Sequence, residues 1–208
     1  MFSLPSAPWS RSSALRALRR PDPPPSTQGH LIGVDGVTIV TLGPKPFTAG
    51  VSGDTDRWNT NLGRTGLIVN GDDVTATGLF VEHFQQYNTV WNGERGTVVL
   101  HQNELAYDPP TQADWTRPDG TLGYPGYKVS DGVKQHDLYG AGVYGYNRNN
   151  PAIVTENGFE APATEGVTLR HIMTVNLGAG TIKHVVNGVG TQADTTNTGT
   201  PQYVVQYQ

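Results

Sequence analysis

The 208-residue chain contains no cysteine, so disulfide bonds, thiolate metal sites and a cysteine nucleophile are excluded. No apolar run reaches the roughly 18 residues that a membrane-spanning helix needs. Basic residues are also few, with 14 Lys and Arg against 18 Asp and Glu and a net charge of -4. This balance argues against binding to a phosphate backbone. We therefore expect neither nucleic acid nor a membrane as a partner, whereas a neutral polymer such as a glycan is compatible.

Several catalytic and cofactor motifs are missing as well. The chain has no phosphate-binding glycine-rich loop with Lys and Ser or Thr, and no G-x-S-x-G nucleophile elbow. A local metal motif such as H-E-x-x-H is also lacking. The glycine-rich stretches GYPGY and YGAGVYGY are aromatic loops rather than nucleotide cradles. We expect no cofactor and no bound metal.

Helix-forming runs are scarce, whereas 26 Gly, 15 Pro and recurring Asn-Gly pairs supply many turns. Five segments share one pattern: each begins with Gly or Asp and a β-branched residue, alternates polar and apolar side chains, and ends near Gly or Asn. They span residues 73–81, 96–103, 132–139, 166–175 and 180–187. Further strands are expected at residues 37–42, 66–69, 89–91, 152–155 and 203–207. Alternation of this kind is the periodicity of a β-strand.

The repeated strand pattern predicts an all-β, right-handed parallel β-helix, in which each turn of the chain forms one rung. A single unit of this size cannot bury its apolar face, but stacked units share a continuous core. The alternative is an antiparallel sandwich or jelly roll, because Asn70-Gly71 and Asn92-Gly93 could form tight hairpins. Strand edges at an open end of such a stack need a cap or a partner.

The chain divides into three parts by composition. Residues 1–30 are rich in Ser, Pro and Arg and are expected to be a disordered tail without a recognisable secretory signal. Residues 31–64 are expected to form an irregular cap. Residues 65–208 are expected to form the rungs, with long loops at residues 106–127 and 139–162, where function tends to reside.

Five short motifs occur in order: VNGDDV at 69–74, GLFVEH at 78–83, WNG at 91–93, QNE at 102–104 and YDPP at 107–110. Through these motifs, residues 50–190 resemble a group of secreted actinobacterial and fungal proteins. These proteins are labelled "coagulation factor 5/8 type domain" or "adenylyl cyclase", and are similar to pectate lyases and, distantly, to glycoside hydrolase family 55 glucanases. The resemblance implies a parallel β-helix, an extracellular setting and contact with carbohydrate. Members are longer, so we expect the chain to correspond to their C-terminal part, truncated at its N-terminal end.

Acidic residues lie in or beside these motifs. Glycoside hydrolysis needs two carboxyl groups, and neighbouring rungs of a β-helix lie about 4.8 Å apart. Glu82 and Glu104 occupy similar places in consecutive rungs and are the best candidate pair. Asp108 is a further catalytic candidate, and His136 beside Asp137 could act as an oriented base. The alternative for each is a solvated or corner hydrogen-bonding residue.

Histidines also recur in the repeated segments, at His101, His136, His171 and His184, and His83 follows Glu82. Their comparable positions predict a structural ladder rather than a metal site. The adjacent Asp72 and Asp73 are expected to form a corner turn, with a calcium site or paired acid as the alternative.

Aromatic residues gather in and near the long loops. Sugars stack on aromatic faces through their apolar C–H patches. Trp91, Tyr107, Trp115 and Tyr127 are therefore the candidate substrate-binding residues, while Tyr124, Tyr139, Tyr144 and Tyr146 are other aromatics of these regions. The alternative is that the rings cover the core beneath the loops.

These features together predict a carbohydrate-active enzyme, a glucanase-like glycoside hydrolase that acts on an extracellular polysaccharide with a carboxylate pair. Two alternatives remain open. The chain could be a non-catalytic glycan-binding or structural β-solenoid module, or an inactive C-terminal fragment of a longer enzyme. A missing N-terminal half of the β-helix, or a second copy of the chain at the open end, is a further possible partner.

Overall fold

A computed structural model of the chain describes residues 18–19, 40–42, 58 and 63–208, and these residues form strands and turns without a helix. The strands are β1 (Leu18–Arg19), β2 (Val40–Leu42), β3 (Leu67–Val69), β4 (Val74–Glu82), β5 (Thr89–Trp91), β6 (Gly96–Glu104), β7 (Tyr127–Val129), β8 (His136–Gly145), β9 (Val154–Glu160), β10 (Val167–Asn176), β11 (Thr181–Val186) and β12 (Gln202–Tyr207). The described part accordingly offers no helix long and apolar enough to cross a membrane.

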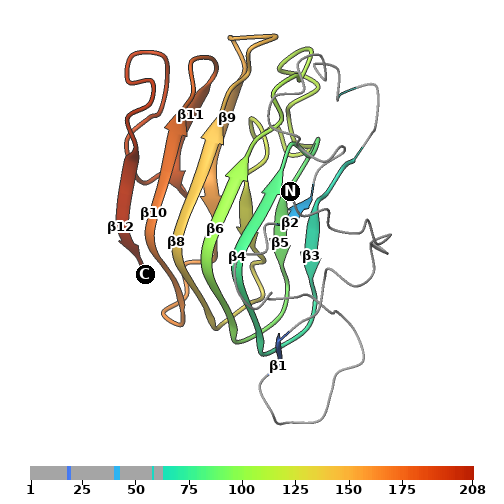
Figure 1. The fold of residues 1–208 in the computed structure, drawn as a ribbon, viewed down its shortest axis with the longest axis vertical. Helices are drawn as coiled ribbons and strands as arrows, with labels where there is room; N and C mark the ends of the chain where they lie inside the picture. The colour runs from blue at the N-terminus through green and yellow to red at the C-terminus, as the bar shows by residue number, and fades with distance from the viewer. Residues whose placement is uncertain (1–17, 20–39, 43–57, 59–62) are drawn as a thin grey trace, which may run out of the picture.

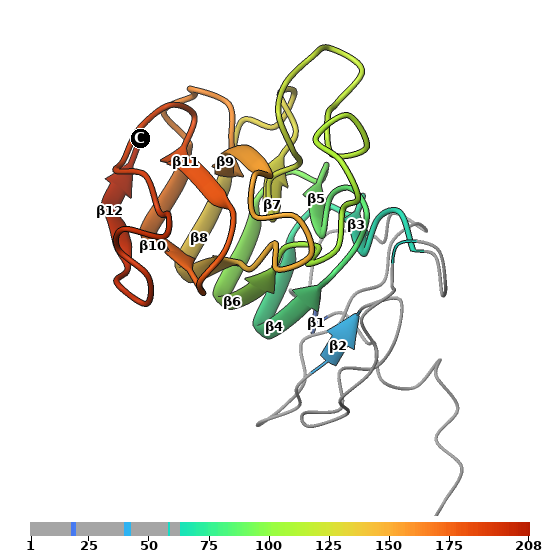
Figure 2. The ribbon, with the colours of Figure 1, turned by 90° about the horizontal axis from the view of Figure 1, so that it is seen from above.

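The strands form two sheets that face each other (Figures 1 and 2). One sheet has the order β1-β4-β6-β8-β10-β12 with β2 also paired to β4, and the second has the order β11-β9-β7-β5-β3. We call them sheet A and sheet B. From β3 to β11, consecutive strands alternate between the sheets, and each strand pairs in parallel with the next strand of its own sheet. This is the connectivity expected of a parallel β-helix.

The predicted all-β fold with parallel strands is confirmed, and the antiparallel sandwich or jelly roll is wrong. Eight of the ten strand pairings are parallel, and only β1–β4 and β10–β12 are antiparallel. The Asn-Gly pairs make corners between the sheets, where the side chain of Asn92 donates to that of Asn70 at 2.7 Å. The right-handed sense of the winding remains a prediction.

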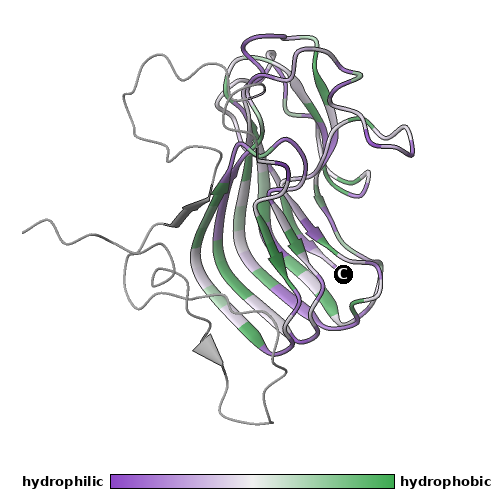
Figure 3. Cartoon of the chain, turned by 90° about the vertical axis from the view of Figure 1, so that its right-hand side faces the viewer, coloured by the Kyte–Doolittle hydropathy of each residue, from purple (hydrophilic) through white to green (hydrophobic). Residues whose placement is uncertain are grey.

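A column of left-handed residues crosses sheet A. Gly78, Leu100, Gly140 and His171 have φ values of 62°, 64°, 67° and 53°. They occupy the same place in four consecutive strands, and the register between the strands passes over each of them. On both sides of each one, a buried residue faces the core, as with Ala76 and Leu79 in β4. The extra residue therefore bends every strand while keeping both halves directed inward (Figure 3).

The core lies between the two sheets and consists mainly of aliphatic side chains. Val98, Leu138 and Leu169 come from sheet A, and Phe159 and Ile182 from sheet B. Burying one such side chain contributes about 1.5–3 kcal/mol. A single rung buries too few of these side chains, so the stability comes from stacking.

The structure corrects several predicted boundaries. The predicted loop at residues 139–162 contains most of β8 and all of β9. Gly142 allows that part of β8 to form. A Cβ atom at this position would lie only 2.8 Å from the ring of Tyr144, which is too close. Residue 127, at the end of the other predicted loop, starts β7. The expected tail at 1–30 and cap at 31–64 lie outside the described residues, apart from β1, β2, Trp58 and residues 63–64.

Candidate functional site

Glu82 and Glu104 lie side by side at the ends of β4 and β6. They are direct partners in the register of sheet A. Glu82 is 5% exposed, whereas the side chain of Glu104 is 17% exposed. One carboxylate oxygen of each, together with a ring nitrogen of His83, lies within 4.8 Å of the others. The structure thus brings together the two predicted carboxylates and a histidine that follows directly in the chain.

Hydrogen-bond donors surround both carboxylates. The hydroxyl of Tyr107 donates to Oε2 of Glu104, and Nε2 of His83 lies 3.3 Å from the same oxygen. The side-chain amide of Gln102 donates to Oε1 of Glu82 at 3.3 Å. Three ligand-type groups at this spacing could also hold a cation, but the hydroxyl of Tyr107 already donates to one oxygen of Glu104. The arrangement is therefore that of a hydrogen-bonded acid–base cluster.

The backbone around Glu104 is fixed by two donors. Its carbonyl oxygen accepts the N–H of His83 and the side-chain amide of Asn88, both at 2.8 Å. The side-chain oxygen of Asn88 in turn accepts the N–H of Phe84 at 2.9 Å. These bonds lock the turn after β4 onto the end of β6, so the two glutamates cannot shift independently.

Asn103, directly before Glu104, points into the core and joins three parts of the chain. Its amide donates to the carbonyl of Val81 at 2.8 Å and to that of Gly126 at 3.2 Å. A Cβ atom on Gly126 would lie 2.2 Å from the Asn103 side chain, so a glycine is required there. The Asn103 side chain thereby holds β4, β6 and the entry to β7 together beneath the carboxylates.

Aromatic and basic side chains border the glutamates on one side. The rings of Tyr107 and Tyr146 meet edge to face with centroids 5.4 Å apart, and the guanidinium of Arg148 lies 5.9 Å from the Tyr107 centroid. Tyr144 is the register partner of Glu104 on β8. Tyr144, Tyr146 and Arg148 were not among the predicted site residues. Alternation turns Tyr144 away from the core between Val143 and Gly145, but only the register of β8 brings it level with Glu104.

Asp108, the third predicted catalytic acid, is buried and accepts the backbone N–H of Trp58 at 3.1 Å. The loop that carries it begins beside Glu104. This contact gives Asp108 a part in attaching the segment around Trp58 to the loop.

His136 is a core residue, which corrects its prediction as a catalytic base. Its ring is buried, its Nε2 lies 2.9 Å from the hydroxyl of Tyr127, and its centroid lies 5.0 Å from that of Trp91. Burial lowers the pKa of His136 to about 3. A base must reach the substrate, and a neutral ring enclosed by other side chains does not.

The predicted histidine ladder is also wrong. His101 is level with Leu79 and Ala141 in the register of sheet A, while His171 occupies the left-handed column and is exposed. His184 lies on β11 of sheet B. The histidines follow a glycine at similar distances along the chain, but they are not partners in the register of the sheets. The reason is that each strand begins at a different distance from that glycine.

Three of the four predicted sugar-binding aromatics are core residues as well. Trp91, Trp115 and Tyr127 expose no surface. The indole N–H of Trp115 donates to the hydroxyl of Thr155 at 2.8 Å, and the Trp91 ring leaves no room for a Cβ on Gly96. A ring without exposed surface cannot stack on a sugar, so the alternative that these rings fill the core is correct. Only Tyr107 lies beside the carboxylates.

The corner at Asp72 and Asp73 carries hydrogen bonds of its own. A carboxylate oxygen of Asp72 accepts the N–H of Glu94 at 2.9 Å, and Asp73 accepts two bonds from the guanidinium of Arg95 at 2.8 and 2.9 Å. These contacts fit the expected corner turn.

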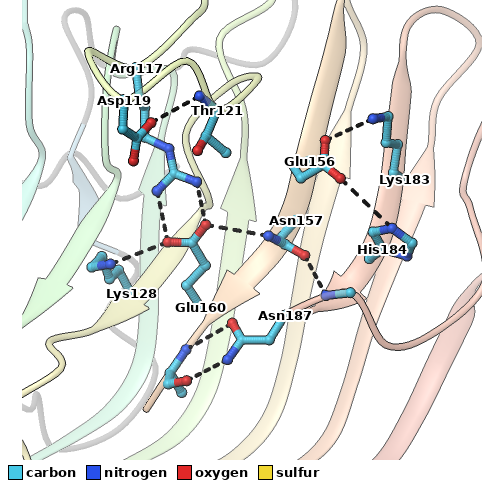
Figure 4. A network of polar contacts seen from close by, with 12 residues as sticks. Arg117, Asp119, Thr121, Lys128, Glu156, Asn157, Glu160, Lys183, His184 and Asn187 are labelled. Atoms are coloured by element: carbon cyan, nitrogen blue, oxygen red, sulfur yellow. Dashed lines mark hydrogen bonds and ion pairs between the residues drawn. The ribbon is translucent and has the colours of Figure 1, made fainter. Parts of the chain in front are cut away.

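A second polar network lies over sheet B (Figure 4). Arg117, from the loop before β7, forms a two-pronged pair with Glu160 at 2.5 and 2.8 Å, and Lys128 approaches Glu160 at 3.3 Å. Burial by itself would raise the pKa of Glu160, but the bonds and charges of Arg117 and Lys128 outweigh it and hold the pKa below its usual value. The network fastens the long loop to sheet B, and no local sequence pattern predicts it.

Comparisons with known proteins find one family model and one curated protein that are similar to part of the chain. Residues 46–104 match the family model of the LAM55 pectate lyase-like domain. The chain is 44% identical over 153 residues to an exo-β-1,3-glucanase of Streptomyces sp. (strain SirexAA-E / ActE). It is similar to a glucanase. The aligned part covers 72% of this chain and 25% of that protein, so the chain spans about a quarter of the length of the curated relative it matches.

Two solved structures are similar to the described fold. The structure of sacteLam55A from Streptomyces sp. SirexAA-E has a TM-score of 0.70, and a variant of sacteLam55A in complex with glucose has a TM-score of 0.68. Each is 43% identical, with 73% of this chain and 27% of the other covered. These findings support the pectate-lyase-like and glucanase part of the expected resemblance. The labels "coagulation factor 5/8 type domain" and "adenylyl cyclase" stay predictions.

Proposed function

We propose that the chain carries a site for the hydrolysis of an extracellular β-1,3-glucan and that Glu82 and Glu104 supply its carboxyl groups. The observation that carries the proposal is their placement as register neighbours at one end of sheet A, within 4.8 Å and among hydrogen-bond donors. The similarity to an exo-β-1,3-glucanase supports the substrate class. The chain's modest net charge suits a neutral polysaccharide.

Glu104 is the proposed general acid, and Glu82 the second carboxylate. A general acid must reach the oxygen of the scissile bond, and Glu104 is the more exposed of the two. Tyr107 and His83 hold its Oε2 and so set the direction of the side chain. Glu82 lies deeper, and Gln102 orients it.

The aromatic border is the proposed sugar-binding surface. Tyr107 and Tyr146 are partly exposed and adjoin Glu104, whereas the buried aromatics cannot contact a substrate. Arg148 adds hydrogen-bond donors for sugar hydroxyls at the same border. This surface replaces the one expected from Trp91, Trp115 and Tyr127.

The assignment is tested by Glu104→Gln and Glu82→Gln, with reducing sugar released from a soluble β-1,3-glucan as the readout. Each change keeps the side-chain size and removes the acid, so we expect activity to fall by about 10²–10⁴-fold with an unchanged unfolding temperature. Glu165→Gln is the matched control, because Glu165 is an exposed acid on the turn before β10. Full activity in both site variants would contradict the carboxylate assignment.

A second candidate function is glycan binding without hydrolysis. The favouring observation is that the aligned part covers about a quarter of the relative's length. Binding of β-1,3-glucan oligosaccharides measured by calorimetry, together with no release of reducing sugar by the unmodified chain, would select this function.

A further inference from the structure

His83 is a buried histidine whose two ring nitrogens both face oxygen atoms. Its Nδ1 lies 3.3 Å from the carbonyl oxygen of Leu105, and its Nε2 lies 3.3 Å from Oε2 of Glu104. A carbonyl oxygen only accepts hydrogen bonds, so Nδ1 carries a proton. The other nitrogen then faces a carboxyl group, and one further proton must lie between Nε2 and that group if the two are to form a bond.

The surroundings favour a single proton held jointly by His83 and Glu104. His83 is 3% exposed, so a charge on its ring is costly unless a carboxylate lies close by. The described titratable groups that face it are Glu104 from β6, Glu82 from β4 and Tyr107 from the loop, whose ring centroid lies 4.4 Å away. The distance of 3.3 Å between Nε2 and Oε2 places the two groups within ion-pair range, close enough to share a proton.

The backbone of His83 explains how the ring reaches Glu104. Its φ is 65°, in the left-handed region that His occupies more often than most L-residues. The conformation turns the ring back over the end of β6, where its own N–H also binds the carbonyl of Glu104.

We propose that His83 is a positioning residue that shares one proton with Glu104 and so holds the proton that this acid delivers to the leaving oxygen. The inference rests on the proposed function of Glu104. During hydrolysis, Glu104 gives its proton to the leaving oxygen. The water consumed in the reaction releases one proton in turn, and the return of a proton to Glu104 restores the His83–Glu104 pair, so protons balance over the cycle.

The proton sharing is tested without turnover, by following the ring nitrogens of His83 by NMR as a function of pH in the full chain. In the unmodified protein, His83 and Glu104 lose their shared proton in one step, which the ring nitrogens of His83 report. In Glu104→Gln the carboxyl is gone, so we expect the midpoint for His83 to fall by about one unit or more. His184, half-exposed on β11, is the internal reference and should not move. An unchanged midpoint for His83 in Glu104→Gln would overturn the inference.

The consequence for activity is tested with His83→Gln, which can still donate to Glu104 but cannot exchange a proton with it. We expect kcat to fall tenfold or more with KM changed less than twofold, and the alkaline limb of the pH–rate profile to move to lower pH. His184→Gln should leave the profile unchanged. A lower kcat with an unmoved alkaline limb would assign His83 a purely structural role and contradict proton sharing.

The two proposals fail in different ways. If the unmodified chain hydrolyses no β-1,3-glucan, the proposed function fails, and the NMR titration still decides whether His83 and Glu104 share a proton. If hydrolysis depends on Glu104 but the His83 midpoint is the same with and without the Glu104 carboxyl, the proposed function stands and proton sharing is overturned.

Discussion

At the scale of single residues, His101 and His136 show how burial changes chemistry. Both rings lie in the core, and each has one neutral partner: the hydroxyl of Thr89 at 3.0 Å for His101, and the hydroxyl of Tyr127 for His136. Burial lowers the pKa of each to about 3, against about 6.5 in an unfolded chain. These histidines are polar core residues that the fold keeps neutral.

The lowered pKa values of His101 and His136 predict that the free energy of unfolding falls in acid. Between pH 6.5 and 3, the unfolded chain binds a proton at each histidine and the folded chain does not, so stability rises with pH over this window. Each histidine therefore removes about 1.4 kcal/mol of stability per pH unit as the pH falls below 6.5. Chemical unfolding at pH 7, 6 and 5 measures the effect.

The control is His136→Phe, which keeps an aromatic ring beside Trp91 and removes the titrating group. We expect the slope of stability against pH to fall by about half in this variant. The same slope in the variant and in the unmodified chain would show that His136 does not stay neutral in the fold.

At the scale of strands, the left-handed column decides how sheet A bends. Two of its four residues are glycines, which take a positive φ without cost. The other two, Leu100 and His171, carry side chains that make a positive φ unfavourable. Within one strand the column appears only as a shift in the phase of alternation, as between Ala76 and Leu79 in β4. Only the register between neighbouring strands shows that the four positions coincide.

Gly140 provides a test of this bend. A Cβ atom at Gly140 would meet nothing within 4 Å, so Gly140→Ala changes only the backbone preference. We expect this variant to lose about 1–2 kcal/mol of stability, because alanine resists a φ of 67°. Thermal unfolding measures the loss.

Gly132→Ala is the matched control. Gly132 also has open space around its Cβ position but lacks a positive φ. Alanine there should be neutral or stabilise by a few tenths of a kcal/mol, by restricting the unfolded chain. Equal effects of the two substitutions would show that the left-handed conformation is not needed at Gly140.

At the scale of the whole molecule, the exposed edges of the stack need protection. The edge of β11 is covered by the following turn, through bridges from Ile182 to Ala193 and from Val186 to Val189. The edge of β10 is covered by β12, which runs antiparallel to it and buries Val204 against the core. Such covers prevent one chain from adding its strands to another.

Deletion of residues 201–208 should therefore cause self-association. The deletion removes β12 and leaves the long edge of β10 with unpaired N–H and C=O groups. We expect the shortened chain to form dimers or larger species in light scattering, while the full chain stays smaller at the same concentration. Deletion of Gln208 alone, which lies outside the strand, is the control. A shortened chain with the mass of a monomer would contradict the role of β12 as a cover.

The sequence alone identified the strands whose side chains alternate clearly. β4, β6, β10 and β11 begin and end within one or two residues of the predictions, because alternation reports directly which face is buried. β9 was largely placed in a loop, because polar residues and Gly158 obscure its alternation. β8 was predicted several residues too early in the chain, because its glycines are typical of turns. Their place in a strand is explained only by their surroundings, such as the ring of Tyr144 beside Gly142.

The sequence also determined that Glu82 and Glu104 are neighbours, since both follow strands that repeat one unit. Only the tertiary structure decided which surrounding residues can act with them. His83 reaches Glu104 through a left-handed turn, and Tyr144 is brought level with Glu104 by the register of β8. The packed rungs and the loop before β7 enclose three predicted sugar-binding rings, so these rings cannot contact a substrate: Trp91, Trp115 and Tyr127. The alternation of a strand depends only on consecutive residues and can be recognised in the sequence. Burial depends on contacts with segments distant in the chain, so only the tertiary structure decides it.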